Sequence, residues 1–302
     1  MGDGVNVPPE IPEYDILECV GTGGMSVVWK AREKASGEIC AIKVLNGNLT
    51  TNIEDVSHFY DEERTMERLS HPGVVKSRKL VNSGRLWYFV MEFVDGYNFG
   101  QLLARKQHLS ESDCLLICQS VAAALDYAWN EHGIVHCDIK PENIMINSAG
   151  EIKITDLGLC HTFKFLKDGR MKAADQVFGT PAYISPEQVY GDVEPDCRAD
   201  IYSLAATLYH LSTGRLLFPH MDADATMRAH CDEKMQAKDP REYRPALTRG
   251  FCQLLEAMLV KNRDYRIANW VDVFGLAQDV ERSIAFTPRE TSATSSLKLA
   301  AE

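Results

Sequence analysis

The stretch His136-Cys137-Asp138-Ile139-Lys140-Pro141-Glu142-Asn143 brings three different chemical groups together within eight residues. Asp138 supplies a carboxylate that can orient a hydroxyl group and accept its proton. Lys140 supplies a cation, and Asn143 supplies an amide oxygen that can bind a metal ion. This combination of a base, a cation and a metal ligand predicts a catalytic loop.

The composition is that of a globular protein, with 45% hydrophobic and 25% charged residues over 302 positions. A chain of this length can form one large domain or two modest ones. The net charge of −11 argues against a general nucleic-acid-binding protein, which carries a basic face. The nine cysteines include no C-x-x-C pair and no zinc-like spacing, which predicts reduced thiols in a cytosol.

No apolar run approaches the roughly 18 residues that cross a bilayer. The N-terminal region also lacks the basic and apolar parts of a signal peptide. We therefore expect no membrane segment in this chain and a cytoplasmic location.

The two halves of the chain differ in their hydrophobic patterns. The first half alternates apolar and polar residues around glycines, which predicts strands at residues 16–20, 27–30, 39–44 and 86–93. A surface helix is predicted between them at residues 53–69. After residue 95, helical patterns predict helices at residues 110–133, 200–213 and 249–260, the first between a Ser110 cap and Gly133.

A glycine-rich segment, Gly21-Thr22-Gly23-Gly24-Met25-Ser26, joins the first two predicted strands. Glycines let backbone N–H groups approach phosphate oxygens, although a hairpin with flexible turns would show the same residues. A strand follows rather than a helix, which argues against a dinucleotide-binding fold. Further on, Lys43 lies inside an apolar strand, and its burial would require an anionic partner, Glu62 or Glu63.

Later segments add further carboxylates. Asp156-Leu157-Gly158 lies 18 residues past Asp138, where a carboxylate could chelate magnesium, although D-x-G is otherwise a common turn. Asp200 begins a predicted helix, and could accept backbone N–H bonds from the catalytic loop, act as a plain N-cap, or do both. We also expect Glu187 to pair with Arg266.

These segments, in this order and spacing, resemble the motifs of the protein kinase superfamily from about residue 12 to 283. The catalytic stretch is similar to H-R-D-x-x-x-x-N, and Gly179-Thr180-Pro181 through Glu187 is similar to the end of the activation segment. The glycine-rich turn and the segment from Val90 to Gly96 look most like bacterial eukaryotic-type (Hanks-type) Ser/Thr protein kinases.

The resemblance implies an α+β, bilobal protein kinase fold. A small β-rich N-lobe with one αC helix would span residues 12–94, and a larger, mainly helical C-lobe would span residues 95–283. Residues 284–302 are rich in Ser and Thr with little to bury, which is typical of a disordered tail.

The resemblance also implies the catalytic residues Lys43, Glu62, Asp138 and Lys140, and the metal ligands Asn143 and Asp156. Lys43 would hold the α- and β-phosphates of ATP, paired with Glu62, which the spacing to His71-Pro72 favours over Glu63. Asp138 would act as the base, and Lys140 would contact the γ-phosphate. The metal would be Mg²⁺, with Mn²⁺ as an alternative.

The nucleotide would be held by the glycine-rich segment and by residues around the adenine ring. The residues implied are Gly21, Thr22, Gly23, Gly24, Met25, Ser26, Val28, Ala41, Lys43, Met91, Glu92, Val94 and Met145. Met91 would be the gatekeeper, and Glu92 and Val94 would offer backbone hydrogen bonds to adenine. Val28, Ala41 and Met145 would sandwich the ring.

Cys137 replaces an arginine that usually pairs with a phosphate on the activation segment. From Phe163 to Gly179 that segment contains no Ser, Thr or Tyr, so Thr162 and Thr180 are the nearest hydroxyl residues on its two sides. We therefore expect a kinase that does not need activation-loop phosphorylation.

The predicted function is Mg²⁺-assisted transfer of a phosphoryl group from ATP to Ser/Thr hydroxyls of proteins. A pseudokinase scaffold that binds nucleotide or protein partners without catalysis is the alternative, and the intact catalytic residues argue against it. The segment from Thr180 to Glu187 argues against a small-molecule phosphotransferase. Remaining expectations are no nucleic-acid partner, a homodimer through the N-lobe, and the cytoplasmic part of a longer membrane-attached protein as an alternative setting.

Overall fold

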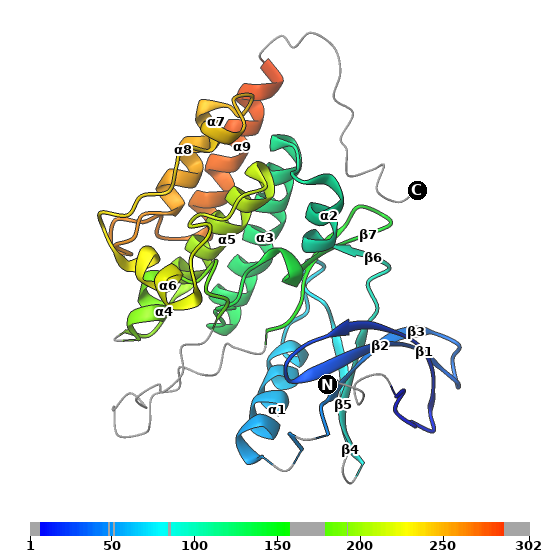
Figure 1. The fold of residues 1–302 in the computed structure, drawn as a ribbon. Helices are drawn as coiled ribbons and strands as arrows, with labels where there is room; N and C mark the ends of the chain where they lie inside the picture. The colour runs from blue at the N-terminus through cyan, green and yellow to red at the C-terminus, as the bar shows by residue number, and fades with distance from the viewer. Residues whose placement is uncertain are drawn as a thin grey trace. The chain divides into compact units, whose positions relative to one another are not determined.

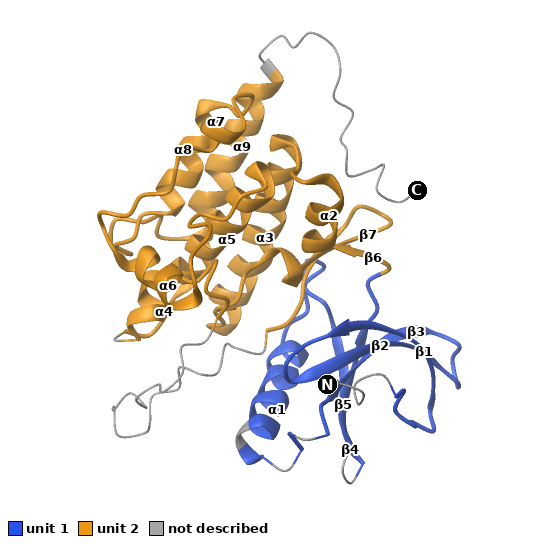
Figure 2. Ribbon diagram, viewed as in Figure 1, with its two compact units in different colours: residues 1–94 blue, residues 95–302 orange. Residues whose placement is uncertain are grey.

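The computed structural model describes residues 7–47, 49–50, 52–83, 86–157, 179–191 and 193–286. The chain divides into two compact units, Met1–Val94 and Asp95–Glu302 (Figure 2). Strands dominate the first unit and helices the second (Figure 1).

Unit 1 contains an antiparallel sheet in the order β1-β2-β3-β5-β4, together with helix α1. The elements are β1 (Tyr14–Thr22), β2 (Ser26–Glu33), β3 (Ile39–Leu45), α1 (Ile53–Glu67), β4 (Ser77–Ser83) and β5 (Leu86–Glu92). The four predicted strands and the predicted helix are confirmed. β4 was not predicted, because its sequence SRKLVNS lacks the alternation that marks a half-buried strand.

The two faces of this sheet have different roles, because alternate side chains on a strand point to opposite sides. One face forms a core cluster of Ile11, Tyr14, Val27, Trp29, Ala31, Cys40, Ile42, Val44, Tyr88 and Val90. On the other face, Lys43 lies opposite Val28 and Phe89 on the neighbouring strands, and Ala41 lies opposite Met91. The predicted nucleotide-binding side chains of the strands therefore share the face that does not form this core.

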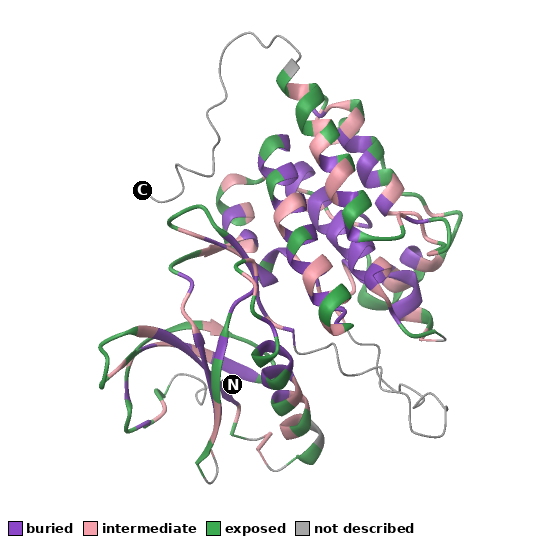
Figure 3. Ribbon diagram, turned by 180° about the vertical axis from the view of Figure 1, so that it is seen from behind, coloured by how far each residue is buried: buried purple, intermediate pink, exposed green. Residues whose placement is uncertain are grey.

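Unit 2 is built around α3 (Glu111–His132), which packs beside α9 (Trp270–Phe286), and α5 (Cys197–Thr213), most of which is buried (Figures 1 and 3). The other helices are α2 (Phe99–Lys106), α4 (Pro186–Tyr190), α6 (Ala223–Cys231), α7 (Pro240–Tyr243) and α8 (Arg249–Met258). Ser110 caps α3 by accepting the N–H of Asp113, and Gly133 ends the helix with a φ of 63°, as predicted.

A small antiparallel sheet, β6-β7-β8, lies in the same unit. Its strands are β6 (Gly96–Asn98), β7 (Ile144–Asn147) and β8 (Ile152–Ile154), and a 3-10 turn at Pro141–Asn143 leads into β7. The catalytic stretch therefore runs directly into the β7–β8 hairpin.

The C-terminal boundary needs one correction. α9 continues to Phe286, so residues 284–286 are helical rather than part of the predicted tail. Ile284 is partly buried and so prolongs the packed face of the helix. Residues 287–302 lie outside the described residues. Within the described ranges, no helix is both long enough and apolar enough to span a membrane.

Candidate active site

Asp200, on α5, supports the backbone of the catalytic loop. Its carboxylate oxygens accept the N–H groups of His136 at 2.6 Å and Cys137 at 2.7 Å. Burial raises the pKa of Asp200 to about 6, against the opposing influence of His136 and the two N–H donors. The N-cap of α5 is Asp196. The predicted brace on the catalytic loop is therefore confirmed, and the plain N-cap alternative for Asp200 is wrong.

Cys137 adopts a left-handed backbone conformation, with a φ of 65°. Such a conformation is strained for a residue other than glycine and persists only where its surroundings hold it. Here the carbonyl of Cys137 also accepts the side-chain amide of Gln188 at 2.7 Å. The residue is 2% exposed and belongs to an apolar cluster with Val135, Ala199 and Trp129. Cys137 thus fills the space beneath the loop.

His136 connects the loop to the end of β8. Its Nδ1 accepts the N–H of Asp138 at 3.3 Å, so the ring proton resides on Nε2. Nε2 then donates to the carbonyl of Thr155 at 3.0 Å. The backbone that carries Asp138 is therefore tied to the backbone that leads to Asp156.

The carboxylate of Asp138 accepts four hydrogen bonds. Oδ1 accepts the N–H of Thr180 at 3.0 Å and its hydroxyl at 2.7 Å. Oδ2 accepts Nζ of Lys140 at 2.6 Å and Nδ2 of Asn143 at 3.1 Å. The contact with Thr180, which lies 42 residues away from Asp138, was not predicted. The structure thus brings together the predicted base, cation and amide, and adds one hydroxyl.

Thr180 reaches Asp138 because the chain passes very close to the catalytic loop at Gly179. The φ of Gly179 is +126°, and a Cβ there would lie 3.3 Å from the carbonyl oxygen of Cys137. Lys140 also donates to the hydroxyl of Thr180 at 2.9 Å. The Gly-Thr pair therefore joins the two segments of the site.

Asn143 and Asp156 flank the open end of the β7–β8 hairpin. Ile144 pairs with Ile154, and the N–H of Thr155 donates to the carbonyl of Asn143 at 3.0 Å. Because Nδ2 of Asn143 donates to Asp138, its amide oxygen remains as a ligand atom. Asp156 is partly buried, with a φ of 61°. The two predicted metal ligands thus come from neighbouring backbone positions, whereas Gly158 lies outside the described residues.

Glu187 and Arg266 form the predicted ion pair. The guanidinium donates to the two oxygens of Glu187 at 2.7 and 3.0 Å, and both side chains are buried. Arg266 also donates to the carbonyls of Val260 and Lys261. The end of the activation segment is therefore fixed to the body of unit 2.

In unit 1, Nζ of Lys43 lies 2.5 Å from Oε1 of Glu62, and both side chains are buried. Glu63 instead accepts a hydrogen bond from the hydroxyl of Ser77 at 3.0 Å. The predicted choice of Glu62 over Glu63 as the partner of Lys43 is confirmed.

The glycine-rich segment forms the turn between β1 and β2. The N–H of Gly23 donates to the carbonyl of Ser26 at 2.8 Å. Asn46 fixes the tip, donating from its backbone to Met25 at 2.9 Å and from its side chain to Gly24 at 3.0 Å. A Cβ at Gly24 would meet nothing within 4 Å. Neither packing nor a positive φ therefore demands glycine there. The contacts of Asn46 with this turn were not predicted.

The predicted adenine contacts lie on two strands. Met91 and Glu92 end β5, and the N–H of Glu92 donates to the carbonyl of Lys76 at 2.8 Å. Val94 follows and is buried, whereas Met145 lies on β7 of unit 2, opposite Lys153.

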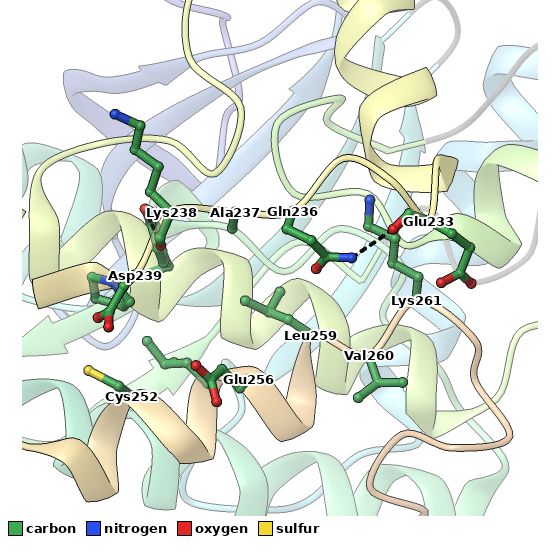
Figure 4. A pocket seen from close by; sticks show the side chains of 13 residues that line it. Glu233, Gln236, Ala237, Lys238, Asp239, Cys252, Glu256, Leu259, Val260 and Lys261 are labelled. Carbon is green, nitrogen blue, oxygen red and sulfur yellow. Dashed lines mark hydrogen bonds between the residues drawn. The ribbon is translucent and has the colours of Figure 1, made fainter. Parts of the chain in front are cut away.

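A separate cavity of about 490 Å³ in unit 2 is bordered by α5, α8 and the loop before α7 (Figure 4). Tyr209, Leu255 and Leu259 line its apolar part, and Glu233 and Glu256 lie at its rim. It contains none of the predicted site residues.

Two known proteins are similar to most of this chain. The chain is 31% identical over 278 residues to the probable serine/threonine-protein kinase PknB of Lactococcus lactis, covering 91% of this chain and 43% of that protein. It is 33% identical over 255 residues to the serine/threonine-protein kinase PknA of Mycobacterium tuberculosis, covering 82% of this chain and 57% of that protein. The chain thus spans about half the length of these relatives.

Among solved structures, the PknI kinase domain of Mycobacterium tuberculosis matches with a TM-score of 0.68 at 24% identity, covering 90% of this chain and 97% of that one. This likeness confirms the expected fold. The family model described as the protein kinase domain matches residues 14–278. The chain therefore belongs to the protein kinase family.

Proposed function

We propose that the protein transfers the γ-phosphoryl group of ATP to serine and threonine hydroxyls of other proteins. The observation that carries the proposal is the arrangement of Lys140, Asn143 and Thr180 around Asp138. The relatives PknA and PknB, which carry the name serine/threonine-protein kinase, support the choice of substrate class.

Asp138 would orient the substrate hydroxyl and accept its proton. An ionised carboxylate has about four lone-pair sites, and all four are used by the donors that surround it. A substrate hydroxyl must therefore displace one donor. Lys140 is suited to leave, because its flexible ammonium could move from Asp138 to the incoming phosphoryl oxygen. Substrate binding and neutralisation of the γ-phosphate would then be coupled through the side chain of Lys140.

Asn143 and Asp156 fit a magnesium ion. Mg²⁺ prefers oxygen ligands and is usually bound in proteins through one or two carboxylates together with substrate phosphates. The amide oxygen of Asn143 and the carboxylate of Asp156 supply oxygen ligands from neighbouring positions at the end of the hairpin. When bound, the metal would neutralise charge on the phosphates.

In unit 1, Lys43 would hold the α- and β-phosphates, with Glu62 fixing its ammonium group. The glycine turn anchored by Asn46 would cover the phosphates, because the open space at Gly24 permits close approach. Val28, Ala41 and Met91 would contact adenine from the sheet face that they share with Lys43. The carbonyl of Glu92 and the backbone of Val94 would complete its recognition.

The same proposal includes activity without activation-loop phosphorylation. Cys137 has no cationic group to bind a phosphate, and its side chain fills an apolar cluster. The hydroxyl of Thr180 is already bonded to Asp138 and Lys140. We expect phosphatase-treated enzyme to keep its kcat. A large loss of activity that maps to a phosphorylated site in the loop would contradict this.

The setting of the domain is also a proposal. All eight cysteines in the described ranges are free thiols, which supports a reducing cytoplasm, where ATP is available. The greater length of the relatives allows the domain to be the cytoplasmic part of a membrane-attached protein. A homodimer formed through unit 1 would be tested by analytical ultracentrifugation.

The decisive experiment incubates the protein with radiolabelled ATP, Mg²⁺ and a generic protein substrate. The wild type should label the substrate on Ser and Thr, and Asp138→Asn and Lys43→Met should not. The exposed-residue variants Asp224→Asn and Lys234→Met serve as matched controls. Nucleotide binding without labelling by the wild type would favour the pseudokinase alternative. Labelling that survives both site variants would overturn the residue assignments.

A further inference from the structure

Helix α1 makes a second polar contact with the sheet beside the Lys43–Glu62 pair. The hydroxyl of Ser77, the first residue of β4, donates to Oε1 of Glu63 at 3.0 Å. Glu63 is 4% exposed and Ser77 is 5% exposed. A buried carboxylate is costly unless it is hydrogen-bonded, so this bond constrains where the helix can lie.

The contacts of α1 with the sheet follow one helical face. Phe59 lies three and four residues before the two glutamates, and its ring is 5.0 Å from the ring of Phe89 on β5. Glu62 then reaches β3, and Glu63 reaches β4. The helix thus contacts three different strands from successive positions.

We propose that the Ser77–Glu63 hydrogen bond is a positioning contact that sets the rotation and height of α1, so that Glu62 meets Lys43. The inference rests on the proposed kinase function. Apolar contact between Phe59 and Phe89 is non-directional and tolerates sliding, whereas a hydrogen bond requires a defined distance and angle. Because Glu63 directly follows Glu62 in the helix, a shift of one carboxylate moves the other.

The first test replaces Ser77. Ser77→Ala removes the donor, so α1 should shift to hydrate Glu63, and the Lys43–Glu62 pair should loosen. We expect kcat to fall about tenfold, which corresponds to about 1.4 kcal/mol, with the KM for ATP changed less than about twofold. Ser77→Thr keeps the hydroxyl and should restore kcat. An unchanged kcat in Ser77→Ala would overturn the proposal.

Repeating the Ser77→Ala substitution in a Glu62→Gln variant separates a positioning effect on α1 from a general loss of stability. In Glu62→Gln the proposed target is already impaired, so Ser77→Ala should cause no further loss of kcat. An equal tenfold loss in both backgrounds would contradict a role that acts through Glu62. In addition, Ser77→Ala/Glu63→Leu removes both buried polar groups and should recover the Tm while kcat stays low. Recovery of kcat together with the Tm would also overturn the proposal.

Hydrogen exchange of the peptide 53–67 in nucleotide-free protein supplies a readout that needs no turnover. Exchange should be faster in Ser77→Ala than in the wild type and in Ser77→Thr. Equal exchange in all three would show that the bond does not position α1. This result is obtained even if the wild type phosphorylates nothing, so failure of the proposed function and failure of the positioning contact are distinguishable.

Discussion

Asp200 holds the backbone of Cys137 in a left-handed conformation, which the side chain of Cys137 disfavours. The carboxylate of Asp200 accepts the N–H of Cys137 at 2.7 Å, and the φ of Cys137 is 65°. A non-glycine residue in the left-handed backbone region costs about 1–3 kcal/mol, which the surroundings must offset. The chain places Asp138 immediately after this strained residue, so the direction of the proposed catalytic carboxylate depends on Asp200.

Asp200→Ala should therefore destabilise the protein and the catalytic loop together. Two buried N–H groups, those of His136 and Cys137, would lose their acceptor, which costs about 2–5 kcal/mol in the free energy of unfolding. Chemical denaturation measures this loss. Asp222→Ala, which removes an exposed cap on α6, is the control and should cost about 1 kcal/mol. Equal losses in the two variants would show that Asp200 is only a helix-terminal residue.

Asp156→Ala should remove metal-supported turnover while leaving the fold intact. Loss of one electrostatic contact to a transferring group typically lowers kcat by about 10²–10³-fold. Titration of activity against Mg²⁺, with thermal unfolding as the check on folding, measures the effect. Asp224→Ala should behave as the wild type. Wild-type activity in Asp156→Ala would mean that another carboxylate binds the metal.

Stability should fall in acid because of buried histidines in unit 2. Burial and nearby Lys261 lower the pKa of His230 to about 4, and its Nδ1 is 2.9 Å from the hydroxyl of Tyr202. An unfolded histidine titrates near 6.5, so between pH 6.5 and 4 the unfolded state binds a proton that the folded state does not. The free energy of unfolding then falls as the pH falls, by up to about 1.4 kcal/mol per pH unit.

Two other groups affect the same pH range. Burial lowers the pKa of His210 to about 4, which adds to the effect of His230. The raised pKa of Asp200, about 6, opposes it between pH 4 and 6, because there the folded state keeps a proton that the unfolded state has lost. Urea unfolding at several pH values gives the free energy of unfolding as a function of pH. This free energy should depend less steeply on pH in His230→Gln than in the wild type. The same slope in both would contradict the assignment.

Cys137→Ala should leave the sensitivity of the enzyme to hydrogen peroxide unchanged. Oxidation requires an accessible thiol, and Cys137 as a whole residue is only 2% exposed. Activity after a timed peroxide treatment, for the wild type and the variant, measures this. Protection by the substitution would show that the loop opens enough to expose the thiol. The neighbouring candidate Cys160 lies outside the described residues.

Local patterns predicted much of this structure. Ser110 and Gly133 bound α3 as expected, because caps act within one helical turn. The pairing of Lys43 with Glu62 followed from family spacing, and Asn143 and Asp156 were chosen from family motifs. In each case the signal is a cap residue or a motif at a fixed position in the sequence.

Contacts between distant segments could not be predicted in this way. Asn46 anchors the glycine turn, Gln188 bonds the carbonyl of Cys137, and Ser77 bonds Glu63. Each is a single polar side chain whose partner is set by tertiary packing and leaves no periodic signal in the sequence. β4 was missed for a related reason, since its pairing with β5 outweighs its weak strand pattern.

The bonds of Thr180 have a consequence for covalent regulation. A modifying enzyme would first have to withdraw the hydroxyl from Asp138 and Lys140. Attachment of a phosphate would place a dianion beside the carboxylate of Asp138 and repel it. Phosphorylation of Thr180 would therefore switch the protein off. The rate of this phosphorylation would report how often the Thr180 hydroxyl leaves Asp138 and Lys140.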